Sequence, residues 1–145
     1  MRNPSQPSLM QELVQALSHA ERAVVRRLEP ALEAEGCSVA QWRVLLLLAD
    51  RRGHPMSEIA EFALVPAPSL TRLVDRMVTD GLVHRRADDR DRRRTLVHLT
   101  PRGLALHRRL DARVQREEDA VLVQAGEDEA QALLDLLAAL VARLR

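Results

Sequence analysis

The residues with the clearest chemical purpose form an arginine run, Arg90-Asp91-Arg92-Arg93-Arg94. A guanidinium group is planar, stays charged at physiological pH, and matches the geometry of phosphate oxygens and base edges. All 22 basic residues of the chain are arginines, a bias that genome base composition can also produce. The run itself is too dense for an ordinary solvated helix face. We therefore expect it to contact nucleic acid.

The distribution of charge along the chain supports this interpretation. Residues 81–116 hold 11 Arg against 4 Asp, a net charge of +7, although the whole chain carries only +1. Residues 1–80 carry a net charge of −1, and residues 117–145 carry −5. A basic segment within a nearly neutral chain is typical of a nucleic-acid site.

No other set of residues indicates a catalytic, metal-binding or phosphate-binding site. The five histidines lack the i,i+4 spacing of a helical metal site, and the chain has no Cys-x-x-Cys pair. The glycines are scattered, so no phosphate-binding loop is predicted. His84 and His98 face each other across a predicted hairpin, which leaves open a metal site completed by acidic residues of two chains. We expect no cofactor, no metal and no enzyme activity.

Length and composition indicate one globular domain with an appended helical element. The chain has 145 residues, of which 46% are hydrophobic and 30% charged. Trp42 and Phe62 are the only aromatic residues, and both are expected in a core built from Leu, Val and Ala. The first eight residues are polar, and no apolar run approaches the roughly 20 residues of a membrane span. A single cysteine suits a reducing compartment. We expect a cytoplasmic protein without membrane contact.

The middle of the chain predicts a helix-turn-helix. Helices are predicted at 9–35, from Ser38 onward, at 58–64 with Ser57 as N-cap, and at 69–80. A tight turn at 65–68 separates the last two, and Gly81 follows as a residue that adopts a positive φ. A short helix, a tight turn and a second helix with an apolar inner face are typical of DNA-binding pairs.

The residues after Gly81 make the interpretation more specific. Residues 82–86 and 95–99 read as short strands, and the polar residues 87–94 form the tip between them. A basic hairpin that directly follows a helix-turn-helix is a wing.

Amphipathic helices flank this winged region. Pro30 is expected to bend or divide the first, while Thr100-Pro101 starts a helix to about Gln124 and Gly126 precedes the last one. These flanking helices, which we call the arms, carry apolar stripes. Because such stripes must be buried against another apolar surface, we expect a homodimer. The predicted dimerisation residues are Leu9, Leu13, Leu17, Val24, Leu28, Leu133, Leu137, Leu140 and Leu144.

The expected fold is mainly α with a small β-hairpin wing. A winged helix-turn-helix DNA-binding region spans 38–100, and a helical dimerisation region comprises 9–35 and 101–145. A helical protein-interaction module that does not bind DNA is the alternative.

The chain resembles the MarR family of bacterial transcriptional regulators over nearly its full length. The Asp-x-x-Asp-x-Arg wing that leads into a strand and Leu-Thr-x-x-Gly is the most specific part of the match. The matching residues are Gln41-Trp42-Arg43-Val44-Leu45, Leu70-Thr71-Arg72-Leu73-Val74-Asp75-Arg76, Asp80-Gly81-Leu82-Val83, Asp88-Asp89-Arg90-Asp91-Arg92-Arg93 and Leu99-Thr100-Pro101-Arg102-Gly103. The resemblance implies a homodimer that binds a near-palindromic operator in double-stranded DNA, usually as a repressor.

The resemblance also implies roles for individual residues. The N-terminal half of the second helix of the pair enters the major groove, and the wing arginine enters the minor groove while an aspartate orients it. In this sequence those wing residues are Arg93 and Asp91, and the flanking arginines contact phosphates. The expected DNA-binding residues are Ala67, Pro68, Ser69, Thr71, Arg72, Arg76, Arg90, Asp91, Arg92, Arg93 and Arg94.

Regulation is less defined than DNA binding. Family members that bind phenolic ligands use aromatic side chains between the arms and the winged lobe, and this chain has few aromatic residues. A small-molecule effector in that crevice is the expected form of regulation. A redox switch at Cys37 is the alternative, although this cysteine lies between the first two helices rather than early in the first helix.

Overall fold

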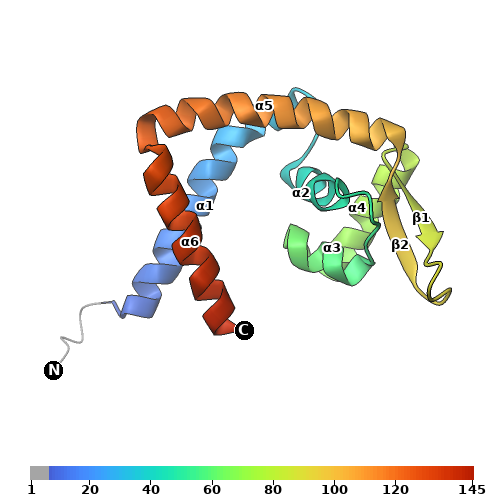
Figure 1. Ribbon diagram of the computed structural model, residues 1–145, viewed down its shortest axis with the longest axis horizontal. Coiled ribbons are helices and arrows are strands. Elements are labelled where there is room, and N and C mark those ends of the chain that lie inside the picture. The colour runs from blue at the N-terminus through green and yellow to red at the C-terminus, as the bar shows by residue number, and fades with distance from the viewer. Residues whose placement is uncertain (1–6) are drawn as a thin grey trace.

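The computed structural model describes residues 7–145, and residues 1–6 of the polar N-terminal segment lie outside the described part. The elements are α1 (Leu9–Glu33), α2 (Val39–Leu48), α3 (Met56–Ala63), α4 (Ala67–Thr79), β1 (Val83–Ala87), β2 (Thr95–Leu99), α5 (Pro101–Ala125) and α6 (Glu127–Leu144). Helix α5 lies across the top of the molecule in Figure 1. Helices α1 and α6 extend below one end of it, and the lobe formed by α2, α3, α4 and the hairpin lies below the other. No helix within residues 7–145 is both long and apolar enough to cross a membrane.

Helix starts follow the local capping signals. Ser8 and Ser38 each form a capping box, in which the serine side chain accepts from the N3 backbone N–H and a glutamine side chain accepts from the serine backbone N–H. Thr100 caps α5, with Pro101 at its first position. The antiparallel hairpin also forms as expected, with Val83 opposite Leu99.

Three local expectations are wrong. Helix α3 begins at Met56 after Pro55, so Ser57 lies in its first turn and is not the cap. Helix α4 begins at Ala67, because a proline in the first helical turn needs no hydrogen-bond partner for its nitrogen. Pro30 was expected to bend or divide α1, but it does not divide the helix, which continues to Glu33.

The core lies inside the winged lobe and continues under α5. Helix α2 is central to it, since none of residues 39–49 is fully exposed. Trp42 packs against the core as expected, whereas Phe62 does not, because 49% of it is exposed at the surface of α3. The largest fully buried side chains are Leu32, Leu45, Leu48, Ile59, Leu70, Met77, Leu110, Val44, Val74, Val83 and Val97.

The first turn of α5 is locked onto the lobe. The Thr100 hydroxyl donates to the Gly81 carbonyl oxygen at 2.6 Å, and the Gly103 N–H donates to the Thr100 hydroxyl oxygen at 3.0 Å. Gly103 is so close to the preceding loop that an added Cβ would lie 2.0 Å from the Leu82 carbonyl oxygen. The start of the long arm is therefore fixed relative to the lobe.

A second contact fixes α5 further along its length. Glu35, just after α1, accepts hydrogen bonds from Arg109 Nε at 2.9 Å and Arg113 Nε at 2.7 Å. These hydrogen bonds from Arg109 and Arg113 hold the pKa of Glu35 below its usual value. Because Glu35 lies in the α1–α2 connection, this pair of guanidinium groups ties that connection to α5.

The helical arms expose much apolar surface in the single chain. Its accessible area is 10857 Å², whereas a compact monomer of this mass exposes about 7,500 Å². Of the predicted stripe residues, Leu9, Leu17, Val24, Leu133 and Leu144 are exposed. The other four are half-buried, and Leu28 already packs against the core. The exposed set also includes Met10, Val14, Leu134, Leu136 and Val141, which the stripe pattern missed.

The contact at Gly103 predicts a large effect of a single methyl group. Gly103→Ala should lower the free energy of unfolding by roughly 2–3 kcal/mol, because backbone must move to admit the Cβ. The neighbouring Arg102→Ala, at an exposed position, should change it by less than about 0.5 kcal/mol. Thermal unfolding at one fixed protein concentration measures both. Equal stability of the two variants would contradict the locked geometry.

Candidate nucleic-acid interface

The predicted recognition helix presents its candidate residues to solvent. Helix α4 turns Leu70, Val74 and Met77 into the core, so the opposite face is open. The Thr71 hydroxyl donates to the Ala67 carbonyl oxygen at 3.1 Å, which leaves its oxygen able to accept from a base or a bound water. The exposed candidates on this helix are Ala67, Pro68, Ser69, Thr71, Arg72 and Arg76.

The tip of the wing holds one arginine in a defined orientation. Asp91 Oδ1 accepts from the Arg93 backbone N–H at 3.1 Å and from Arg93 Nε at 3.3 Å. Asp91 is itself partly sheltered, while 92% of the Arg93 side chain is exposed. Because a hydrogen-bonded carboxylate limits the directions that a long side chain can take, Arg93 projects from the tip already oriented.

Other arginines surround this tip. Arg90, Arg92 and Arg94 are exposed, and the Arg90 backbone N–H donates to Asp88 Oδ1 in the turn. Arg86 lies on β1 and pairs with Asp89 at 3.0 Å. Arg86 and Arg90, together with Arg52 from the loop before α3, line a hollow of about 590 Å³ on the face of the wing. Arg52 and Arg86 were not among the residues expected from the sequence.

One ion pair joins the recognition helix to the wing. Arg85 Nη2 of β1 lies 2.6 Å from Asp75 Oδ1 of α4. This pair was not expected from the sequence, although the alternation of the strand gives a signal, since Arg85 shares a face with the buried Val83. The pair fixes α4 and β1 side by side, so the two candidate DNA-contacting elements keep a constant separation.

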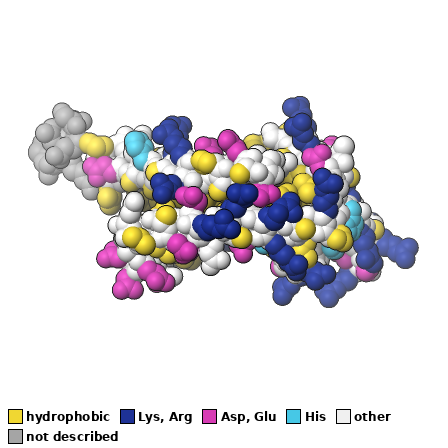
Figure 2. Space-filling model, turned by 90° about the horizontal axis from the view of Figure 1, so that it is seen from above, with side chains coloured by type: hydrophobic (Ala, Val, Ile, Leu, Met, Phe, Trp, Pro, Cys, Tyr) yellow, Lys and Arg dark blue, Asp and Glu magenta, His cyan; other side chains and the backbone are white. Residues whose placement is uncertain are grey.

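The arginines are concentrated at the lobe end of the molecule. In Figure 2, seen from above α5, dark blue side chains gather at the wing end, and several acidic side chains gather at the opposite end. The acidic end corresponds to the α5–α6 junction, where α6 carries Glu127, Asp128 and Glu129 in its first turn. Negatively charged DNA is therefore repelled by the acidic end and attracted to the lobe.

Known proteins share this sequence and this arrangement. Residues 35–94 match the model of the MarR family. The chain is 32% identical over 124 residues to the HTH-type transcriptional regulator FarR of Neisseria gonorrhoeae, covering 86% of this chain and 85% of that regulator. The chain belongs to the MarR family. As a MarR-family protein it is a winged helix-turn-helix transcriptional regulator.

Two solved structures show what MarR-like folds bind. The chain is similar to NadR in complex with 4-hydroxyphenylacetate, with a TM-score of 0.81, 29% identity and 97% coverage of both chains. It is also similar to the transcriptional repressor CouR bound to a 23-mer DNA duplex, with a TM-score of 0.78, 30% identity, and coverage of 94% of this chain and 99% of that one.

The two histidines of the wing face each other across the hairpin, as expected. His84 and His98 lie opposite each other, with their rings stacked at a centroid separation of 5.5 Å. Burial, together with the nearby His84, lowers the pKa of His98. Among residues 7–145, no group of three or more His, Cys, Asp or Glu side chains is placed to hold a metal ion.

Cys37 is poorly suited to redox chemistry in this fold. Its side chain is buried, and burial raises the pKa of its thiol to about 11. Because the thiolate is the reactive form, this raised pKa disfavours redox chemistry of Cys37 at neutral pH. The positive end of the α2 dipole lies nearby, but it does not offset the cost of burying a thiolate charge at Cys37.

The wing geometry predicts a specific loss on substitution. Arg93→Ala should weaken DNA binding by roughly 1–3 kcal/mol per half-site and reduce the salt dependence of the binding constant, with folding unchanged. Arg108→Ala removes an exposed arginine from α5 and serves as the charge-matched control. Fluorescence anisotropy at several salt concentrations measures both variants. If the two bind DNA with the same affinity, the role assigned to Arg93 is wrong.

Proposed function

We propose that this protein is a repressor that binds a near-palindromic operator as a homodimer in the bacterial cytoplasm. The observation that carries this proposal is the pairing of an open α4 face with an Asp91-oriented Arg93 on one rigid lobe. In the proposed complex, Ser69, Thr71 and Arg72 read the major groove. Arg93 enters the minor groove, and the other tip arginines contact phosphates.

The exposed arms support the homodimer. The chain exposes about 3,000 Å² more than a compact monomer of its mass, which is within the area that an obligate dimer interface buries. Leu9 of α1 and Leu133 and Leu144 of α6 contribute to this surface. A second copy offers the same apolar surface, so a two-fold axis satisfies both chains at once.

We also propose a small aromatic acid as effector. An apolar groove of about 420 Å³ lies between α1 and α5, walled by Val24, Leu28, Val114 and Val121. It lies within the helical arms, whereas the sequence placed the effector between the arms and the lobe. Arg27 at its edge pairs with Glu117 at 3.2 Å, so a ligand carboxylate would compete with Glu117 for the guanidinium group. The NadR complex with 4-hydroxyphenylacetate supports this ligand class.

The test of the main proposal is binding to the DNA upstream of the protein's own gene. We expect a 2:1 complex of chains to operator, specific over random duplex by at least about a thousandfold at physiological salt. Sedimentation of the free protein at micromolar concentration should give a dimer. A folded monomer, or equal affinity for random DNA, would contradict the proposal.

The effector proposal predicts a selective response. Millimolar 4-hydroxyphenylacetate should raise the melting temperature of the parent protein and release the DNA. Arg27→Ala should lose this response, while Arg26→Ala, an exposed neighbour, should keep it.

Peroxide should not release the DNA from the parent or from Cys37→Ser. Release by peroxide in the parent alone would favour a thiol switch instead.

A further inference from the structure

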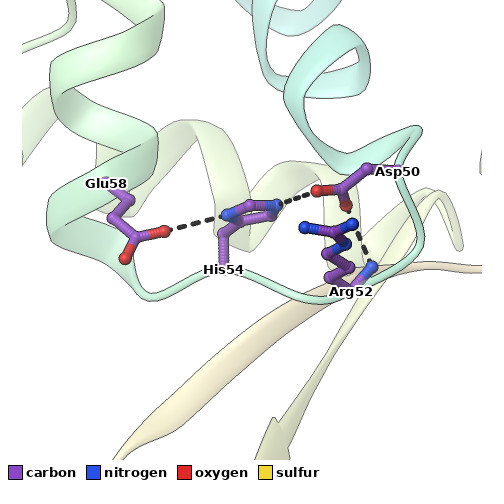
Figure 3. A network of polar contacts seen from close by, with 4 residues as sticks. All are labelled: Asp50, Arg52, His54 and Glu58. Carbon is purple, nitrogen blue, oxygen red and sulfur yellow. Dashed lines mark hydrogen bonds and ion pairs between the residues drawn. The ribbon is translucent and has the colours of Figure 1, made fainter.

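His54 lies where three parts of the lobe meet. Its Nε2 is 2.9 Å from Asp50 Oδ2, just after α2, and its Nδ1 is 2.9 Å from Glu58 Oε2 of α3. Figure 3 shows the imidazole ring spanning the two carboxylates. The His54 backbone N–H donates to the Val97 carbonyl oxygen of β2 at 3.1 Å, and its carbonyl accepts from the Val97 N–H at 2.9 Å. This one residue therefore joins α2, α3 and the wing.

The two carboxylates define which form of the ring fits. A neutral imidazole has one N–H donor and one acceptor nitrogen, whereas the imidazolium form has two donors. Ionised Asp50 and Glu58 can only accept. Both short contacts are therefore favourable only when His54 is protonated. In the neutral form, one nitrogen lone pair would face a carboxylate oxygen.

We propose that His54, as the imidazolium, is a positioning residue that holds the wing and α3 in the arrangement that binds DNA. Loss of its proton weakens one of the two links and so lowers affinity for the operator. This inference rests on the proposed DNA-binding function and adds a group that does not itself touch DNA.

The surrounding charges favour the protonated form. Burial of the ring works against the charge, but hydrogen bonds to Glu58 and Asp50 outweigh it and raise the pKa of His54. Arg52, in the same loop, donates its backbone N–H to Asp50 Oδ1. On the wing side, the charged or titratable groups near this junction are His98, His84, Arg86 and Asp89.

Close packing transmits a shift at His54 to the wing. The His98 ring lies over Gly53, where an added Cβ would come within 2.2 Å of His98 Cε1. At Gly53, the loop that carries His54 is therefore packed tightly against the His98 ring of β2. When the loop moves because a carboxylate contact is lost, β2 must move with it, and the position of Arg93 relative to α4 changes.

The sign of the pH effect follows from the direction of the pKa shift. Because the folded pKa of His54 is raised, its contribution is complete below the ordinary histidine value and is lost as pH rises through the folded value. Folding stability should therefore decrease toward alkaline pH. Operator affinity should decrease over the same range because, in the proposed role, the neutral ring no longer holds the wing and α3 together. Protonation of His98 also adds positive charge to the wing, so the total slope of affinity against pH does not by itself identify His54.

The decisive experiment compares Glu58→Gln with Glu61→Gln, an exposed position on the same helix that gives the same change of charge. In the Glu58→Gln variant, neutral His54 can donate to Asp50 and accept from the new side-chain amide, so both contacts survive deprotonation. Operator affinity is measured by anisotropy from about pH 6 to about pH 8.5 at constant ionic strength. The parent and Glu61→Gln should weaken about tenfold over this range, and Glu58→Gln by less than about threefold.

His54→Gln provides a second variant, and thermal unfolding over the same pH range a second measurement. This variant should bind at all pH values as weakly as the parent binds at the alkaline end of the range. Equal slopes for the parent and Glu58→Gln would overturn the inference, because the slope would then come from groups other than His54. A parent that binds its operator equally at both ends of the range would also overturn it. Failure to bind DNA at every pH would overturn the proposed function and the inference together.

Discussion

The rest of the structure depends on how α5 leaves the wing. The Thr100 hydroxyl holds the Gly81 carbonyl and caps α5, while Gly103 brings the helix backbone against the Leu82 carbonyl. A single 25-residue helix thus begins in the DNA-binding lobe and ends in the helical arms. Because a helix is stiff over this length, the position of the arms determines the position of the lobe. Contacts from Arg109 and Arg113 to Glu35 reinforce that relation.

The arginines of the lobe fall into two groups. Some form ion pairs that fix the geometry of the lobe, and the others remain exposed and available to a binding partner. Arg85 with Asp75 and Arg93 with Asp91 bind elements or side chains of the lobe to each other. Such exposed pairs contribute little to stability, so their value lies in orientation. The remaining exposed arginines give the lobe its positive potential, and the acidic α5–α6 junction keeps the opposite end unattractive to DNA. His54 adds a third kind of contact, one whose strength depends on a proton.

Much of the fold was predictable because its signals are local. Ser8, Ser38 and Thr100 start helices through bonds to residues three positions away, and the hairpin follows from two short strand-like segments on either side of a polar tip. The position of the wing candidates at an exposed hairpin tip was predictable for the same reason, since the arginine run is contiguous. The expectations were wrong or incomplete where the structure depends on contacts between residues far apart in the chain, or on the surroundings of a single residue. Phe62 is exposed although its type favours a core position, and Pro55 starts α3 without a side-chain cap. The contacts of Glu35 with Arg109 and of His54 with Val97 join residues far apart in the chain, which spacing alone does not reveal.

In the proposed complex, a dimer presents two rigid lobes to two successive major grooves. Selection of bound duplexes from a random-sequence pool tests it most directly. We expect the selected DNA to contain an inverted repeat, with half-site centres separated by one helical turn of about 10 base pairs or a multiple of it. Enrichment of a single unrepeated half-site, or of no sequence at all, would contradict it.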